Sequence, residues 1–150
     1  MSDMGIIGYG IVGKAVEYGF KDLNNIRFYD KYKKSDSLEE VINSSEFIFV
    51  CLPTPYSISK RGIDLDIMDE NIENISRLSG GTDKIIIMKS SVLPGTTRDY
   101  AVKYKDCNFC FNPEFLTEAN LWQTVFWQRR LFLAMRYMIY ARNLELIMTR

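Results

Sequence analysis

Apolar residues occur between residues 4 and 111 in short runs, each of the length expected for a buried strand. These runs are 4–7, 26–29, 47–52, 84–88 and 108–111. Between them, apolar positions take the spacing of helices over 11–20, 66–78 and 96–104. A shorter helix is predicted to begin at Ser37, because Glu40 stands at the distance of a capping box. The segment 57–64 is polar and typical of a mobile connection.

The alternation of strands and helices predicts the fold class. Regular alternation favours an α/β domain in which a parallel sheet carries helices on both faces. The uninterrupted run of isoleucines at 85–87 is typical of a central strand in such a sheet. We therefore expect a Rossmann-type, doubly wound parallel sheet, with its last strand or strands missing or replaced by a helical tail.

A glycine motif lies between the first predicted strand and the first predicted helix. Residues 8–13 read Gly-Tyr-Gly-Ile-Val-Gly, which is the G-x-G-x-x-G pattern. Gly8 permits a tight turn, Gly10 lets a pyrophosphate approach the backbone, and Gly13 allows close contact between helix and sheet. The helix that follows, beginning with Ile11 and Val12, would offer free N–H groups to the phosphates. A purely structural glycine turn is the alternative.

Asp30 strengthens the case for a dinucleotide. It ends the second predicted strand, where a carboxylate can accept hydrogen bonds from the adenosine ribose hydroxyls. Lys31, Lys33 and Lys34 follow, and lysines at this place could instead neutralise the 2′-phosphate of NADP. We predict NAD, because the Asp30 carboxylate would repel that phosphate. Asp30 and Lys31 are both expected at the cofactor.

Composition excludes several other classes of function. The chain has 150 residues, 19 basic and 19 acidic, so no net charge favours nucleic acid or a membrane surface. No apolar stretch reaches the ~20 residues that span a bilayer. The absence of histidine removes histidine-based catalysis and histidine-ligated metals, and no metal site is expected. Cys107 and Cys110 have CxxC spacing but lie on a predicted strand and are expected to be structural, so a reducing cytoplasm is the expected location.

Further motifs follow the third, fourth and fifth predicted strands. They read Cys-Leu-Pro-Thr-Pro at 51–55, Lys-Ser-Ser-Val-Leu-Pro-Gly-Thr-Thr at 89–97, and Asn-Pro-Glu-Phe-Leu-Thr-Glu at 112–118. Each one follows the carboxyl end of a strand, which is the edge where doubly wound sheets bind their ligands. With these motifs in this order, residues 4–120 resemble the N-terminal, NAD-binding domain of the UDP-glucose/GDP-mannose dehydrogenase family.

The resemblance implies an activity. Members of that family oxidise the C6 alcohol of a nucleotide sugar twice, through a thioester on a cysteine, and reduce two NAD. They act in polysaccharide biosynthesis on UDP-sugar substrates, and they oligomerise. By position, Pro53 and Thr54 would flank the NAD and Ser90 would contact it.

The same resemblance implies catalytic and substrate residues. Ser91 stands where the family usually has a threonine that positions a catalytic water, and a serine hydroxyl can make the same hydrogen bond. Glu114 would assist hydrolysis of the thioester, a role that suits a carboxylate near a bound water. Phe115 and Leu116 would border the sugar nucleotide, together with Glu114, and Glu118 would lie at the nicotinamide as a catalytic and cofactor residue.

After Asn120 the resemblance is expected to stop. We therefore divide the chain into an NAD-binding domain, 1–120, and an aberrant or divergent tail, 121–150. One hypothesis is a single-nucleotide frameshift near Leu121, and the other is a genuine helix over 118–146. The family's catalytic lysine and cysteine lie beyond the resemblance, so the chain is expected to be inactive alone. A 3-hydroxyacid or 6-phosphogluconate-type dehydrogenase domain and a non-catalytic NAD-sensing domain are the alternatives.

Overall fold

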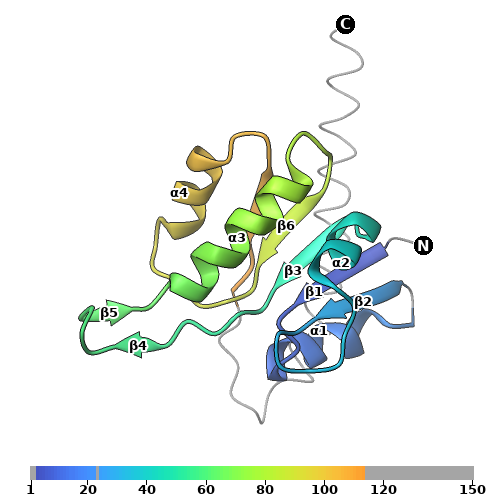
Figure 1. The fold of residues 1–150 in the computed structure, drawn as a ribbon, viewed down its shortest axis with the longest axis horizontal. Helices are drawn as coiled ribbons and strands as arrows, with labels where there is room; N and C mark the ends of the chain where they lie inside the picture. The colour runs from blue at the N-terminus through green and yellow to red at the C-terminus, as the bar shows by residue number, and fades with distance from the viewer. Residues whose placement is uncertain (1–2, 23, 114–150) are drawn as a thin grey trace, which may run out of the picture.

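Strands and helices alternate along the chain as predicted (Figure 1). The computed structural model describes residues 3–22 and 24–113. The strands are β1 (Asp3–Ile7), β2 (Asn25–Tyr29), β3 (Phe47–Val50), β4 (Tyr56–Ser57), β5 (Gly62–Ile63), β6 (Ile85–Met88) and β7 (Asn108–Phe111). The helices are α1 (Ile11–Phe20), α2 (Leu38–Ser44), α3 (Asp66–Ser79) and α4 (Thr96–Lys103).

Five of these strands form one parallel sheet in the order β2-β1-β3-β6-β7. From β1 the chain first builds the sheet in one direction, to β2, and then in the other, through β3 and β6 to β7. The order therefore reverses between β1 and β3, and open α/β sheets bind ligands in the crevice outside the carboxyl ends of the strands at this point. The Rossmann-type fold class is confirmed.

The sheet separates two apolar clusters, because successive side chains of a strand point to opposite faces. Ile48 and Val50 of β3 pack with α2, α3 and Tyr100 of α4 on one face. Phe47 and Phe49 of the same strand pack with α1 on the other face. Helices therefore cover both faces, as the doubly wound prediction requires.

Ser37 begins α2 with the predicted capping box. Its hydroxyl accepts from the backbone N–H of Glu40, and the Glu40 carboxylate accepts from the backbone N–H of Ser37. Each side chain thus supplies a partner for a backbone N–H at the start of the helix.

None of the helices within residues 3–22 and 24–113 is long and apolar enough to cross a membrane.

The structure departs from the sequence prediction after β3. The segment expected to be a mobile connection forms a hairpin, β4–β5, that extends away from the sheet (Figure 1). At the hairpin, the Lys60 ammonium lies 2.7 Å from the Asp64 carboxylate and 2.5 Å from that of Asp66. The third strand ends at Val50 instead of Leu52, and beyond it the Leu52 carbonyl accepts from the Ser90 hydroxyl at 2.7 Å.

Helix α3 differs from the prediction in the face that it buries. Helical spacing groups Ile67 with the apolar residues Ile72 and Ile75, but the Ile67 side chain is 43% exposed. The fully buried positions are Met68, Ile72 and Ile75, which share one face at helical spacing. Ile67 consequently lies on a different face of α3, and that face borders the candidate site.

Candidate functional site

The packing of the fold requires two of the three motif glycines. Gly8 has φ +92°, and a Cβ there would lie 2.6 Å from the carbonyl oxygen of Cys51. A Cβ on Gly13 would lie 2.3 Å from the carbonyl oxygen of Gly8. Both distances are far shorter than a van der Waals contact, so neither position can carry a side chain without moving the backbone. The predicted roles of Gly8 in the turn and of Gly13 in close packing fit this geometry.

Gly10 is different, because the protein itself does not require a glycine there. Its φ is −80°, and a Cβ would meet no atom within 4 Å. It is the N-cap of α1, it has no side chain that could cap the helix, and the first turn carries no acidic residue. The N–H groups of that turn, from Ile11 onward, are open to an anion. A pyrophosphate therefore fits beside Gly10, where a side chain would obstruct it.

A pocket of about 560 Å³ begins at this loop and continues to α3. The volume lies in the ordinary range for small-molecule sites. Seven of the predicted cofactor residues line this pocket. They come from the glycine loop and the start of α1, from the segment after β2 and from the segment after β3. The seven are Gly8, Gly10, Ile11, Val12, Asp30, Lys31 and Pro53. Gly13 is buried behind them.

Asp30 lies between the glycine loop and the loop that follows β2, and only 12% of its side chain is exposed. One carboxylate oxygen accepts from the N–H of Tyr9 at 2.9 Å and the other from the N–H of Tyr32 at 3.0 Å. Burial raises the pKa of Asp30, but those two hydrogen bonds and the Lys33 ammonium outweigh it, so the pKa lies below its usual value. Asp30 thus remains a charged acceptor. Its Oδ2 atom also lies 3.5 Å from the Lys33 ammonium, so Oδ1 is the oxygen better placed to accept from a ribose hydroxyl.

Tyr9, the second residue of the glycine motif, holds the outside of the loop. Its ring stacks on Phe28 with centroids 3.9 Å apart, and its hydroxyl donates to the Glu17 carboxylate. That hydrogen bond, burial and the nearby charge of Glu17 raise the pKa of Tyr9 to about 12. The Lys33 ammonium donates to the Tyr9 carbonyl. The loop is therefore tied to β2, to α1 and to the segment after β2.

The segments after β3 and β6 are tied to each other by side-chain hydroxyls. Thr54 donates to the carbonyl of Ser91 at 2.8 Å, and Ser90, which is buried, donates to the carbonyl of Leu52 at 2.7 Å. The structure thus brings these three predicted residues together next to Pro53. They lie beside the described pocket and are not part of its lining.

Lys89, which the sequence prediction did not single out, is buried at the end of β6. Its side chain is 1% exposed, and its ammonium donates to the side-chain oxygen of Asn112 at 2.7 Å. This contact links the segment after β6 to the segment after β7. Four of the predicted catalytic and substrate residues follow β7 and lie outside the described residues: Glu114, Phe115, Leu116 and Glu118. The tail 121–150 also lies outside them. Their assigned roles remain predictions.

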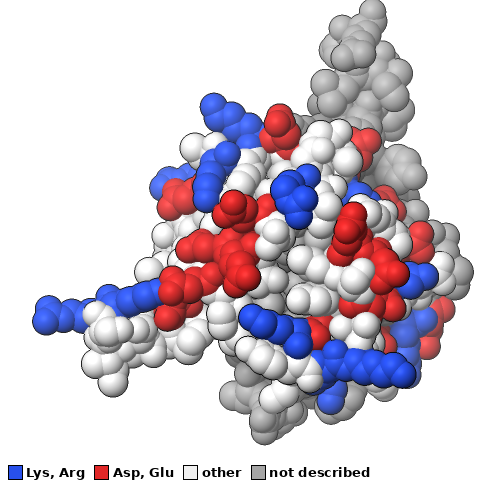
Figure 2. Space-filling model, viewed as in Figure 1, with Lys and Arg blue, Asp and Glu red and all other residues white. Residues whose placement is uncertain are grey.

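The sequence prediction also missed the far wall of the pocket, which α3 provides. Ile67, Glu70, Asn71 and Asn74 line the pocket at intervals of three and four residues, so they form one stripe on the helix. The signal was present in the sequence, because the polar residues Glu70, Asn71 and Asn74 recur at helical spacing beside the buried apolar face. Figure 2 shows acidic side chains gathered over α3 and basic side chains along the loop that follows β2.

The fold and this site define a dinucleotide-binding domain of the Rossmann type. The chain belongs to the UDP-glucose/GDP-mannose dehydrogenase family, whose NAD binding domain matches residues 12–137. The matched range continues past residue 120, where the resemblance was expected to stop. The predicted family is therefore confirmed, and so is the predicted cofactor, NAD, because the matching domain is an NAD binding domain. A comparison with curated proteins found no match.

Solved structures share the fold at low sequence identity. A ternary complex of GDP-mannose dehydrogenase from Pseudomonas aeruginosa has TM-score 0.61 and 19% identity over 80% of this chain and 38% of that one. UDP-N-acetyl-mannosamine dehydrogenase from Staphylococcus aureus has TM-score 0.63 and 17% identity over 81% and 38%. An imine reductase from Bacillus cereus has TM-score 0.63 and 15% identity over 80% and 43%. The chain thus spans less than half the length of each of these neighbours.

Proposed function

We propose that this chain is the NAD-binding part of a nucleotide-sugar 6-dehydrogenase of the kind that converts UDP-glucose to UDP-glucuronate. The observation that carries the proposal is Gly10. A Cβ there would meet no atom of the protein within 4 Å, yet the position begins a helix whose first residues, Ile11 and Val12, line the pocket. A bound pyrophosphate explains a glycine that the packing does not need. Membership of the family then supports the class of reaction.

Each part of the pocket has a suitable partner in NAD. The pyrophosphate would lie at Gly10 and the start of α1, and the adenosine ribose would donate its hydroxyls to Asp30. NAD, when bound, supplies the hydride acceptor for oxidation of an alcohol. Asp30 and the acidic residues of α3 disfavour a 2′-phosphate, which supports NAD over NADP. Lys31 is the basic residue on the pocket wall that opposes this preference.

We further propose that Ser91, Glu114 and Glu118 belong to the half of the active site that this chain contributes. A serine hydroxyl that positions water and a carboxylate that accepts its proton form a minimal apparatus for hydrolysis. The cysteine and lysine that complete the reaction in this family would come from a part that residues 12–137 do not include. The chain alone is therefore expected to bind NAD without oxidising a nucleotide sugar.

Titration calorimetry of this chain with NAD, NADP, UDP-glucose and UDP-N-acetylmannosamine tests the proposal. We expect binding of NAD and weaker binding of NADP, because the Asp30 carboxylate is charged throughout the neutral range. Addition of the nucleotide sugars to the NAD complex should produce no NADH absorbance. A chain that is folded by circular dichroism but binds no NAD would contradict the proposal.

A non-catalytic NAD-sensing domain is a second candidate, and one observation favours it. The hydroxyls of Thr54 and Ser90 already serve the fold, since they tie two loops together. Residues of this kind would be retained even in a domain that performs no chemistry. Ser91→Ala separates the two candidates in the full dehydrogenase assembly, because a sensor would keep its response to NAD and a dehydrogenase would lose turnover.

A further inference from the structure

The stripe on α3 places a carboxylate and two amides on the pocket wall, at Glu70, Asn71 and Asn74. The side-chain nitrogen of Asn71 donates to the carbonyl of Ile67 at 2.8 Å, and that of Asn74 donates to the carbonyl of Glu70 at 3.0 Å. A carbonyl can only accept, so these bonds fix which end of each amide is the nitrogen. The amide oxygens of Asn71 and Asn74 are therefore turned away from those helix carbonyls. The Glu70 carboxylate is likewise an acceptor when ionised.

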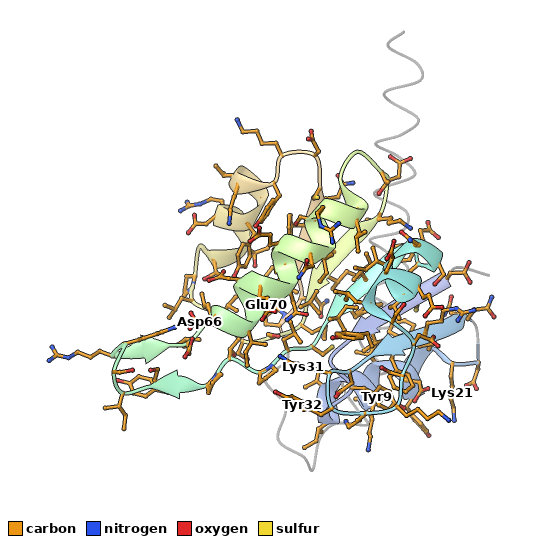
Figure 3. All side chains as sticks on the ribbon, viewed as in Figure 1. Tyr9, Lys21, Lys31, Tyr32, Asp66 and Glu70 are labelled. Atoms are coloured by element: carbon orange, nitrogen blue, oxygen red, sulfur yellow. The ribbon has the colours of Figure 1, made fainter. Side chains whose placement is uncertain are left out.

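The position of the base follows from the rest of the pocket. With the pyrophosphate at Gly10 and the ribose at Asp30, the base must occupy the part of the pocket that lies beyond Asp30. In that part of the pocket, the loop after β2 forms one wall, with Lys31 and Tyr32, and α3 forms the other, with Glu70 (Figure 3). Leu38, Leu52 and Ile67 line the same pocket and supply apolar surface for the faces of a purine ring.

We propose that α3 selects the purine of the cofactor by its 6-amino group, which would donate to the acceptors of Glu70 and Asn71, with Asn74 next in the stripe. A 6-oxo purine, such as hypoxanthine, presents an acceptor at that position and is rejected. This inference rests on the proposed function, because it takes NAD as the occupant. It adds a preference that the glycine loop and Asp30 cannot provide, since neither of them lies at the base.

The physical basis is the mismatch between two acceptors. A site built to receive a donor leaves its own polar groups unpaired when the donor is absent. In the 6-oxo analogue the donor is also replaced by a partial negative charge, which the Glu70 carboxylate repels. Hypoxanthine has a donor at the neighbouring ring nitrogen. The base would have to shift to use that donor, because Asp30 holds its ribose and the apolar walls hold its faces.

The test compares NAD with nicotinamide hypoxanthine dinucleotide by titration calorimetry on the full chain. The wild-type chain is expected to bind NAD at least about tenfold more tightly than the hypoxanthine form. Glu70→Gln introduces an amide that can donate to the 6-oxo group, so the ratio of the two Kd values should fall by about threefold or more. Asn71→Leu should weaken NAD and reduce the ratio as well.

Glu73→Gln is the matched control. Glu73 is exposed on the same helix, outside the pocket lining, and its substitution changes the net charge by the same amount. It should leave the ratio of Kd values unchanged. Thermal unfolding of each variant shows that the loss of affinity is not a loss of fold.

The outcomes distinguish this inference from the proposed function. Equal affinity of the wild-type chain for the two dinucleotides would overturn the inference and leave NAD binding intact. A wild-type preference that survives both Glu70→Gln and Asn71→Leu would also overturn it, because α3 would then not be the selecting element. Failure of the folded chain to bind either dinucleotide would overturn the proposed function and the inference together.

Discussion

Substitution of Gly10 by alanine should weaken NAD binding with little change in stability, whereas the same substitution at Gly13 should lower the stability of the fold. The two residues belong to one motif, and the added methyl group is the same. A Cβ on Gly10 meets nothing within 4 Å, whereas a Cβ on Gly13 lies 2.3 Å from the carbonyl oxygen of Gly8 and 3.2 Å from the side chain of Ile6. Comparison of the two variants therefore separates the demands of the ligand from those of the fold.

The magnitudes follow from these distances. Gly13→Ala overpacks a site bounded by backbone, which costs about 1–3 kcal/mol of unfolding free energy. Gly10 has φ −80°, which alanine adopts readily, so restriction of the unfolded chain favours Gly10→Ala by about 0.4–1 kcal/mol. Alanine is a poorer N-cap than glycine, which offsets part of that gain. The stability of Gly10→Ala should therefore stay within about 0.5 kcal/mol of the wild type.

NAD binding should respond to Gly10→Ala. A methyl group beside the N–H groups of α1 displaces the pyrophosphate, and loss of even one charge-assisted hydrogen bond lowers affinity by about tenfold or more. Urea unfolding and titration calorimetry on both variants measure the two effects. A Gly10→Ala chain that keeps wild-type affinity for NAD would refute the assignment of the phosphate site. A Gly13→Ala chain of unchanged stability would refute the packing argument.

The other predictions concern groups that hold the site together. The pKa of Asp30 is lowered in the folded state, so its contribution to stability is present above the unfolded pKa of about 3.9 and is lost as pH falls through the lower folded pKa. Asp30→Asn should therefore make the thermal unfolding temperature less sensitive to pH in the acid range. An acid profile that is the same in the variant and the wild type would contradict this. Ser90→Ala removes the bond to the Leu52 carbonyl and should cost about 0.5–1.5 kcal/mol in urea unfolding, with a conservative Ser90→Thr variant as control. Asn112→Ala removes a partner of the buried Lys89 ammonium and should cost about 1.5–3 kcal/mol, whereas Asn112→Asp, which retains an acceptor, should cost less.

Much of the fold could be predicted because its determinants are local. Runs of β-forming apolar residues and the Ser37 capping box specify their elements within a few neighbouring residues, and these elements were placed correctly. The β4–β5 hairpin was not predicted because its strands are only two residues each and their sequence is polar. The end of β3 was placed two residues too late, because the apolar run continues through Cys51 and Leu52 although the strand does not.

The candidate site was predictable on one side only. The glycine loop and Asp30 follow directly from rules about strand ends, whereas Pro53 was implied by the resemblance to the family. The structure places all of them on one pocket. The α3 wall was missed because Ile67 was grouped by spacing with the other apolar residues of that helix. Lys89 was missed because a lysine at a strand end is usually in solvent, and only the packed structure shows that it is buried.

Strand β7 has consequences for how the protein behaves in solution. Among the described residues it pairs on one side, with β6, and its Phe111 side chain is 46% exposed. At the opposite border of the sheet, β2 carries Arg27, a charge that discourages other chains from pairing with it. The sequence of β7, Asn-Phe-Cys-Phe, has no such charge. Among the described residues, β7 is therefore the strand whose outer edge most readily accepts a strand from another chain.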